Sequence, residues 1–364
     1  MPSTPVSRRA GAWIISGGKT PSRLSRARYF QAALFVALPC AIVIGLTNGA
    51  VAISLTEAAA GLLDTLTGNQ ASQASVIVGQ LRLPRVLLAA VMGAILAISG
   101  AAMQGLFRNP LADPSLIGIT AGASLGAALA IVAGGTLLQG YLGLTLVSAG
   151  AFIGGAIAVL FVYRLATTAN GTSVATMLLA GIAITALAGA LGGLLEFFAD
   201  NERLRRISLW KMGGLEGANY PRLLLAVAVS AALLVALPRH AKALNALLLG
   251  ESEARHLGIR VERVKIALVF WVAVGVGTSV AMVGTIAFVG LVVPHMVRMI
   301  TGPDHHQLLP ASALAGALLL VLADTLARVL LAPTELPVGI ITAIVGVPFF
   351  ISLLRKRHQY GMQS

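Results

Sequence analysis

Long apolar runs, separated by short polar segments, set the pattern of this chain. A helix that crosses a bilayer needs about 20 apolar residues, and ten runs approach that length. They cover roughly residues 30–50, 84–106, 115–134, 142–163, 174–198, 222–238, 264–282, 285–300, 309–331 and 338–354. The runs at 115–134 and 285–300 are short and broken by Gly or Pro, which is tolerated where the backbone is buried in protein. The pattern predicts an all-α membrane protein with about ten transmembrane helices.

The composition supports the same class. Of the 364 residues, 57% are hydrophobic and only 11% are charged, whereas an ordinary soluble domain is about 25% charged. So few polar residues cannot cover a globule of this size, which excludes a water-soluble enzyme, a disordered protein and a secreted disulfide scaffold. The 40 Gly residues indicate helices that pack closely in lipid. Because Cys40 is the one cysteine, neither a disulfide framework nor a Cys/His zinc site is expected.

The basic residues predict the topology. The formal net charge is +13, and with a cytosolic N-terminus 18 of the 26 Lys and Arg residues fall on the cytosolic side against 8 on the other. Because Lys and Arg favour the cytosolic side, both termini are expected in the cytosol. We expect a basic cytosolic tail over residues 1–29, a ten-helix membrane domain over 30–355 and a cytosolic tail over 356–364. The expected partner of the basic excess is membrane lipid and not nucleic acid.

The internal loop over residues 239–263 is unusually informative. It reads ALNALLLG followed by ESEARHLG, which predicts two short helices separated at Gly250 and closed at Gly258. Glu251 and Arg255 stand four residues apart and can pair on one helical face. The first helix is apolar enough to need a partner surface. The loop is therefore either a surface hairpin between two membrane halves or a pair of helices that docks a cytosolic protein.

The external face carries two longer loops and a set of arginines. Residues 51–82 are long enough for an amphipathic segment, and residues 199–221 are polar. The external arginines are Arg82, Arg85, Arg203, Arg205, Arg206 and Arg328. Arg makes bidentate contacts with carboxylates. The set is interpreted as cationic anchors at helix ends, as a docking surface for an acidic partner, or as a capture site for an anionic substrate.

The chain shows no convincing nucleotide site of its own. Its GKT string spans residues 18–20, and a phosphate-binding loop needs a Gly five residues before the Gly of that string. That position is Trp13, and no strand precedes it. Any ATP must therefore be hydrolysed by a separate subunit.

Acidic residues within a membrane are costly and usually functional. Glu196 and Asp324 alone come near the interior of an expected span, and both lie towards its external end. Asp324 precedes Arg328 by four residues, so a helical ion pair explains it, with a proton relay as the alternative. An ion-coupled secondary transporter would carry a midplane acid, which is missing, so an ATP-driven importer is favoured. A membrane enzyme is set aside, because no candidate catalytic residues gather at one depth.

Six blocks of the chain resemble, in family order, the permeases of type II ABC importers, which carry iron siderophores, haem and vitamin B12. They read RLPRVLLAAVMGAILAISGAAMQGLFRNPLADPSLIGITAGASLGA, LLAGIAITALAGA, ADNERLRRISLWKMGGLEGA, LLLGESEARHLGI, GTIAFVGLVVPHMVRMITGPDHHQLLP and DTLARVLLAPTELPVGIITAIVGVPFFISLL. The resemblance covers about residues 75–355 and is specific because all six blocks are collinear.

The resemblance implies a permease fold that works as a homodimer in the bacterial inner membrane. Its implied partners are two cytosolic ATP-binding subunits, which hold ATP and Mg, and a periplasmic substrate-binding protein; no cofactor or metal is expected in this chain. Matching positions imply roles for named residues. The residues implied in ATPase coupling are Leu249, Gly250, Glu251, Ala254, Arg255, Leu257 and Gly258. The residues implied in docking of the binding protein are Arg82, Arg85 and Arg328. The residues implied in a cytosolic gate are Asn109, Leu111, Thr172 and Ser173.

The substrate expectation is haem. The block LLAGIAITALAGALGGLLEFFADNERLRRISLW resembles haem permeases most closely. Haem is a flat apolar ring with two propionates, so a path of Leu, Ala, Gly and Met with Arg205 and Arg206 at its mouth suits it. Ferric siderophores and cobalamin stay open as alternatives. So does the reading that these arginines only cap a span or dock the binding protein.

Overall fold

Helices make up almost all of the computed structural model, which describes residues 23–68, 72–134, 140–169 and 171–361. The longer helices are α1 (Arg23–Thr47), α3 (Leu83–Leu106), α5 (Gly140–Ala166), α6 (Val174–Phe198), α8 (Tyr220–Arg239), α11 (Val261–Val283), α13 (His305–Val329) and α14 (Val338–Gly361). The shorter ones are α2 (Leu55–Thr67), η1 (Ser75–Arg82, π-helical), η2 (Pro114–Ile117, 3-10), α4 (Ile119–Ala133), α7 (Asn201–Met212), α9 (Ala241–Leu247), α10 (Glu251–His256) and α12 (Val289–Thr301). Strands β1 (Thr167–Thr168) and β2 (Gly171–Thr172) pair as an antiparallel hairpin.

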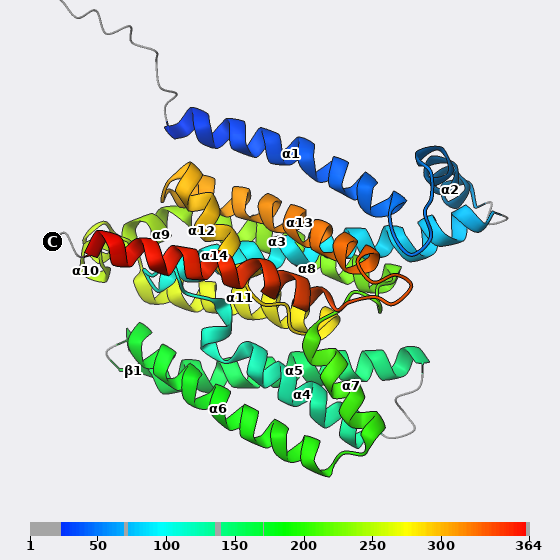
Figure 1. The fold of residues 1–364 in the computed structure, drawn as a ribbon. Helices are drawn as coiled ribbons and strands as arrows, with labels where there is room; N and C mark the ends of the chain where they lie inside the picture. Colours follow the sequence, from blue (N-terminus) through cyan, green and yellow to red (C-terminus); the bar gives the residue numbers. More distant parts are fainter. Residues whose placement is uncertain (1–22, 69–71, 135–139, 170, 362–364) are drawn as a thin grey trace, which may run out of the picture.

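The described part of the chain confirms the expected all-α architecture with about ten spans. Seven segments in it are long and apolar enough to cross a membrane: α1, η1 with α3, α5, α6, α8, α11 and α13. The shorter apolar helices α4, α12 and α14 occupy the three remaining predicted places. Figure 1 shows these helices running broadly along one direction.

The short spans α4 and α12 each follow a break in the chain, and α12 continues through Gly290 and Pro294, where the sequence predicts an interruption. Before α4, the chain forms η2 and turns at Gly118, which has a left-handed φ of 78°. Before α12, Phe288 takes a left-handed φ of 68°, shortly after Gly284 ends α11. Unpaired peptide groups cannot face lipid. The flanking residues Ile117 and Val289 are fully buried, so both breaks lie inside protein.

The described helices extend beyond the apolar runs at both ends of the chain. Helix α1 includes residues 23–29, which belong to the expected N-terminal tail, and α14 continues to Gly361 within the expected tail over 356–364. Apolar residues mark the hydrocarbon layer, but a helix can continue through Lys and Arg because their long side chains reach water. Residues 1–22 and 362–364 lie outside the described residues.

Helix α3 is the centre of the bundle. Every residue from Met92 to Leu106 is buried, and α3 packs against α8, α11, α12 and α13. An added Cβ at Gly93 would lie 2.1 Å from the carbonyl oxygen of Gly316, and the reverse distance is 2.3 Å. The backbones of α3 and α13 therefore touch, as small residues allow in membrane helices.

Helices α4 to α7 form a second group, drawn in teal and green in Figure 1. Here α4 and α5 meet at Gly126 and Gly150, and a Cβ at Gly126 would lie 2.1 Å from the Gly150 oxygen. Helix α11 contacts both groups, through α3 on one side and α4 and α5 on the other. Both described ends of the chain lie at the end of the bundle that holds α10 and β1 (Figure 1). We call this the α10 end and the opposite one the α2 end.

The predicted amphipathic segment at the α2 end folds into α2 and η1. Ser54 begins α2: its Oγ accepts from the Glu57 N–H, and the Glu57 carboxylate accepts from the Ser54 N–H at 2.8 Å. This reciprocal capping box fixes where the helix starts. The Ser54 side chain and then its N–H lower the pKa of Glu57. Leu63 and Leu66 stay exposed, as in helices that lie in a membrane interface.

Candidate functional site

Helices α9 and α10 form a hairpin over residues 241–258, with the two short helices that the sequence predicts. Gly250 between them has a φ of 129° and Gly258 after them has a φ of 80°. Residues with a side chain rarely adopt these angles, so glycine is needed at both bends. Leu247 and Ala254 are buried in a small apolar cluster of the hairpin. The hairpin is therefore a packed unit with fixed bends.

The outer surface of the hairpin is apolar and charged. Leu249 is 67% exposed and Leu257 is 62% exposed. Arg255 lies 3.7 Å from Glu251, which confirms the predicted pair, and also 3.7 Å from Glu262. Exposed ion pairs contribute little to stability. Exposed leucines beside charged groups are instead typical of a surface that contacts another protein.

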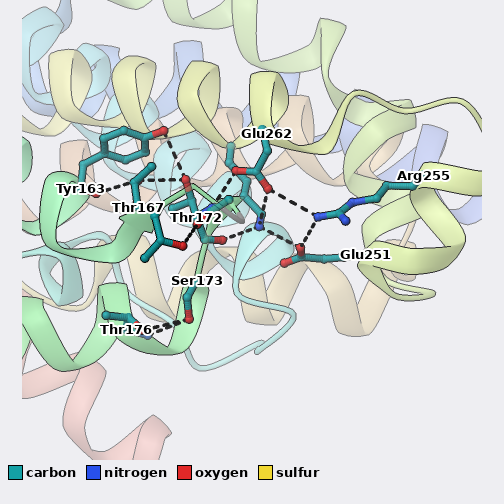
Figure 2. Close-up of polar contacts among 11 residues, drawn as sticks. Tyr163, Thr167, Thr172, Ser173, Thr176, Glu251, Arg255 and Glu262 are labelled. Carbon is teal, nitrogen blue, oxygen red and sulfur yellow. Dashed lines mark hydrogen bonds and ion pairs between the residues drawn. The ribbon is translucent and has the colours of Figure 1, made fainter.

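A buried lysine connects this hairpin to the strand before α6. Lys265 of α11 is 1% exposed, and its Nζ donates to the Thr172 carbonyl oxygen at 2.6 Å, to Glu251 at 2.8 Å and to Glu262 at 3.2 Å. An ammonium group has three donors, and all three are used. Glu262 also accepts from the Thr172 N–H at 2.8 Å. Figure 2 shows Glu251, Glu262 and Thr172 converging; with Lys265 they form what we call the lysine cluster.

Thr172 and Ser173, which are predicted to form part of a gate, join β2 to α6. The Thr172 hydroxyl lies 3.0 Å from that of Thr167 and donates to the Tyr163 hydroxyl at 3.3 Å, as Figure 2 shows. Ser173 is exposed, and its Oγ accepts from the Thr176 N–H at 3.2 Å. This hydrogen bond caps α6. Thr172 therefore directly precedes the residue that caps α6.

A second polar group connects α9 to the start of α13. Asn245 donates to Asp304 at 2.7 Å and accepts from the His305 N–H at 2.9 Å. Burial raises the pKa of Asp304, but the hydrogen bonds from Asn245 and from the His306 N–H outweigh it and lower that pKa. His305 and Leu244 also pack closely against the end of α3, since a Cβ at Gly105 would lie 2.5 Å from His305 Nε2.

Asn109 and Leu111, the other residues of the predicted gate, follow that end of α3 directly. The Asn109 side chain accepts from the Leu111 N–H at 3.0 Å, which is a local turn that Asn stabilises. Asn109 is exposed and Leu111 is half-buried. The hairpin is thus linked to Thr172 through Lys265, from which Glu251 of α10 accepts, and α9 packs against the end of α3 that precedes Asn109.

At the α2 end, the arginines predicted to dock a binding protein are bound internally. Arg82 is 6% exposed and donates to the carbonyl oxygens of Leu46, Thr47 and Val51. These contacts attach η1 to the end of α1. Unpaired buried charges are costly, and here three carbonyl groups compensate the guanidinium. Docking at Arg82 stays a prediction.

Arg85 and Arg328 share one carboxylate. Asp324, 1% exposed, accepts from Arg85 and from Arg328, each at 3.0 Å, which confirms the predicted Asp324–Arg328 pair. Arg328 also donates to the carbonyl oxygens of Gly45 and Asn48, and Arg85 contacts Glu335 at 2.6 Å. Arg82, Arg85 and Arg328 line a pocket of about 410 Å³ at this end, and their docking role stays a prediction.

The proposed substrate arginines lie on α7. Arg205 and Arg206 are exposed, and Arg206 pairs with Glu202 at 2.8 Å. Arg206 also lines a cavity of about 390 Å³ together with Trp210 and other residues of α5, α7 and α8. Glu196, at the end of α6, pairs with Lys211. Within the described residues, no group of three or more His, Cys, Asp or Glu could hold a metal ion.

Sequence reasoning missed Lys265 and Glu262, which it assigned only to the topology count or to a loop. The local signal was an acid and a lysine three residues apart at the start of an apolar run, a spacing that pairs on a helix. Nothing local indicates that the same lysine reaches Thr172, because that contact spans 93 positions.

Comparisons with known proteins agree with this arrangement. The FecCD transport family model matches residues 36–356. The hemin transport system permease protein HmuU of Yersinia pestis is 48% identical over 280 residues, 77% of this chain and 83% of that protein. The cobalamin import system permease protein BtuC of Halobacterium salinarum is 46% identical, over 78% of this chain and 74% of that protein. A solved ABC transporter, described as metal-chelate type and inward-facing, is 32% identical with a TM-score of 0.79, covering 90% of this chain and 99% of that chain.

Proposed function

Because this chain belongs to the FecCD transport family and is the permease of a type II ABC importer, we propose that its cargo is haem. In this proposal haem moves from periplasm to cytoplasm by alternating access at the axis of a homodimer. The observation that carries the proposal is the 48% identity to a hemin permease along most of both chains.

The surface of α6 supports a flat apolar cargo. At Gly189 and Gly193, which are both exposed, an added Cβ would meet no atom within 4 Å in the described structure, so this face of α6 is open. An uncharged surface of small residues suits a porphyrin ring. Arg205 and Arg206 of α7 follow α6 directly and would meet the two propionates, since Arg binds carboxylates through paired hydrogen bonds.

The energy source in this proposal is a pair of cytosolic ATPase subunits that bind ATP and Mg. They would dock on the α9–α10 hairpin, where the exposed Leu249 and Leu257 offer an apolar contact. The α10 end is then cytosolic, and with it both chain termini, in the bacterial inner membrane. The permease itself would be a transport subunit without a catalytic site. ATP binding would move the gates only if the ATPase subunits contact the permease differently in its two states.

The periplasmic binding protein would dock at the α2 end. Arg85 is the most accessible member of the predicted set, with 12% of its side chain accessible. An acidic residue of the binding protein would compete there with Asp324 and Glu335. In the same cycle, the segments at Asn109 and Thr172 would open and close the cytosolic side.

Cobalamin is the second candidate, because a cobalamin permease is 46% identical over a similar share of this chain. Both cargoes are large, metal-centred macrocycles, so the described surfaces of α6 and α7 do not separate them. The identity of the cognate binding protein's ligand would separate them directly.

The deciding experiment reconstitutes the permease, its ATPase and its binding protein in proteoliposomes. We expect haem to accumulate only when ATP, the ATPase and the binding protein are all present. Accumulation of cobalamin or a ferric siderophore in place of haem would show that haem is not the cargo. Accumulation without the ATPase, driven by an ion gradient, would overturn the importer mechanism.

A further inference from the structure

Lys265 brings three separate segments together. Its acceptors are Glu251 in the first turn of α10, Glu262 in the first turn of α11 and the backbone of Thr172 in β2. Only 1% of Lys265 is exposed. A buried ammonium is tolerated only where its hydrogen bonds are fully satisfied. Moving any one of the three acceptors away would leave a buried donor without a partner, so the ammonium holds all three in place.

Hydrogen bonds hold the backbone of Thr172 at both its N–H and its carbonyl oxygen. Its carbonyl oxygen accepts from Lys265 and its N–H donates to Glu262 at 2.8 Å. Its hydroxyl contacts Thr167 and Tyr163 of the preceding segment, as Figure 2 shows. Backbone contacts of this kind fix the position of the main chain itself, and the main chain enters α6 one residue later at Ser173.

Displacement of α10 therefore has two outcomes. Either β2 follows, or the Lys265 ammonium loses an acceptor in a buried place, which is costly. Packing reinforces the first outcome, because α10 and α11 share a small apolar cluster that includes Ala254 and Val261. The cheaper motion is one in which α10, the start of α11 and β2 move as a unit.

We propose that Lys265 is a positioning residue that transmits movement of α10 to the gate segment at Thr172. The proposal rests on the proposed function, since it gives the route by which an ATPase docked on the hairpin acts on one gate. Glu251 and Glu262 complete the route, the first on the moving helix and the second on the Thr172 N–H. The other gate segment, at Asn109, is reached through α9 and is not part of this route.

The first test uses the complete complex in proteoliposomes. Lys265→Met removes the donor, and Arg263→Met is the matched control, because Arg263 is an exposed cation on the same helix. We expect Lys265→Met to hydrolyse ATP at nearly the parent rate but to import roughly tenfold less haem per ATP, within the range usual for coupling between sites. Arg263→Met should match the parent in both, and equal ratios in all three proteins would overturn the proposal.

A second variant separates coupling from charge balance. Lys265→Met leaves Glu251 and Glu262 with the more distant Arg255 in place of the buried ammonium, and that alone could lower transport. The triple variant Glu251→Gln, Glu262→Gln, Lys265→Met removes all three charges at similar volume. If Lys265 only balances charge, the triple variant regains normal uptake and the proposal fails. If Lys265 transmits movement, the triple variant stays uncoupled, while Lys265→Arg retains part of the uptake because it can still donate.

A distance measurement tests the route without any cargo. Spin labels at Ala169 and His256, both exposed, are placed in a Cys40→Ser background and compared with and without ATP in the complex. We expect one unchanged distance in the parent and a distance that shifts or broadens with ATP in Lys265→Met. A parent distance that changes with ATP overturns the proposal. Failure of the parent to import haem overturns only the proposed cargo.

Discussion

The carboxylate of Asp324 holds two buried arginines at the α2 end, and neutralising it should destabilise the permease strongly. Its two oxygens accept from Arg85 and Arg328, each at 3.0 Å, and 1% of it is exposed. Asp324→Asn keeps the shape but leaves Arg328 without its carboxylate partner and Arg85 with Glu335 alone. Breaking a buried ion pair by removing one partner costs about 3–5 kcal/mol.

That loss of unfolding free energy corresponds to a lower melting temperature, Tm. At about 2.1 cal/mol/K per residue, unfolding of the 364-residue chain has an entropy of about 0.76 kcal/mol/K, so the cost lowers Tm by about 4–7 °C. The assay is thermal unfolding of the purified permease in detergent, followed by tryptophan fluorescence. Glu202→Gln is the matched control, because Glu202 also pairs with an arginine four residues later, but at an exposed site.

We expect the control to lower Tm by less than about 1 °C, since exposed pairs contribute about 0.3–0.5 kcal/mol. Adding Arg85→Met to Asp324→Asn should recover part of the loss, because it removes one of the two cations that faced the lost carboxylate. Equal shifts for Asp324→Asn and Glu202→Gln would refute the reasoning, and so would a double variant less stable than the single one.

Three further predictions address docking, coupling and packing. Gly258→Pro cannot adopt the φ of 80° at the end of the hairpin, so ATP hydrolysis should continue while uptake per ATP falls; normal uptake would count against a coupling role. Charge reversal at Arg85 should weaken capture of the binding protein in a pull-down while basal ATPase activity persists, with Tm recorded alongside; unchanged capture would remove the docking role. Gly93→Leu, where a Cβ would lie 2.1 Å from the Gly316 oxygen, should abolish folded protein in size-exclusion chromatography, and a normal elution profile would contradict the close helix contact.

The spans could be predicted from sequence because bilayer thickness dictates the length of each apolar run. The break before α4 could also be predicted, since Gly118 marks it, whereas the break before α12 lies at Phe288 and Pro294 stands inside the helix. Helix ends were less predictable. The first helix includes residues 23–29 and the last reaches Gly361, because hydropathy reports the lipid layer and not where backbone hydrogen bonding stops.

Within the site, contacts inside one helix could be predicted and contacts between segments could not. Glu251–Arg255 and Asp324–Arg328 follow from the helical repeat. Lys265 reaches Glu251 across the bend at Gly258, and neither composition nor spacing encodes that approach. The internal acceptors of Arg82 on α1 were equally invisible, because backbone carbonyl groups carry no sequence signal.

At Gly93–Gly316 and at Gly126–Gly150 the paired helices touch through their backbones, because neither glycine has a side chain to hold them apart. Neither pair can roll or slide without a clash, so each behaves as a stiff block during the transport cycle. Shape change is then concentrated at the border between the blocks, which α11 occupies. Small molecules or crosslinks that fasten α11 to α5 should freeze the cycle, whereas stabilising substitutions inside either block should leave turnover intact and make the permease easier to purify.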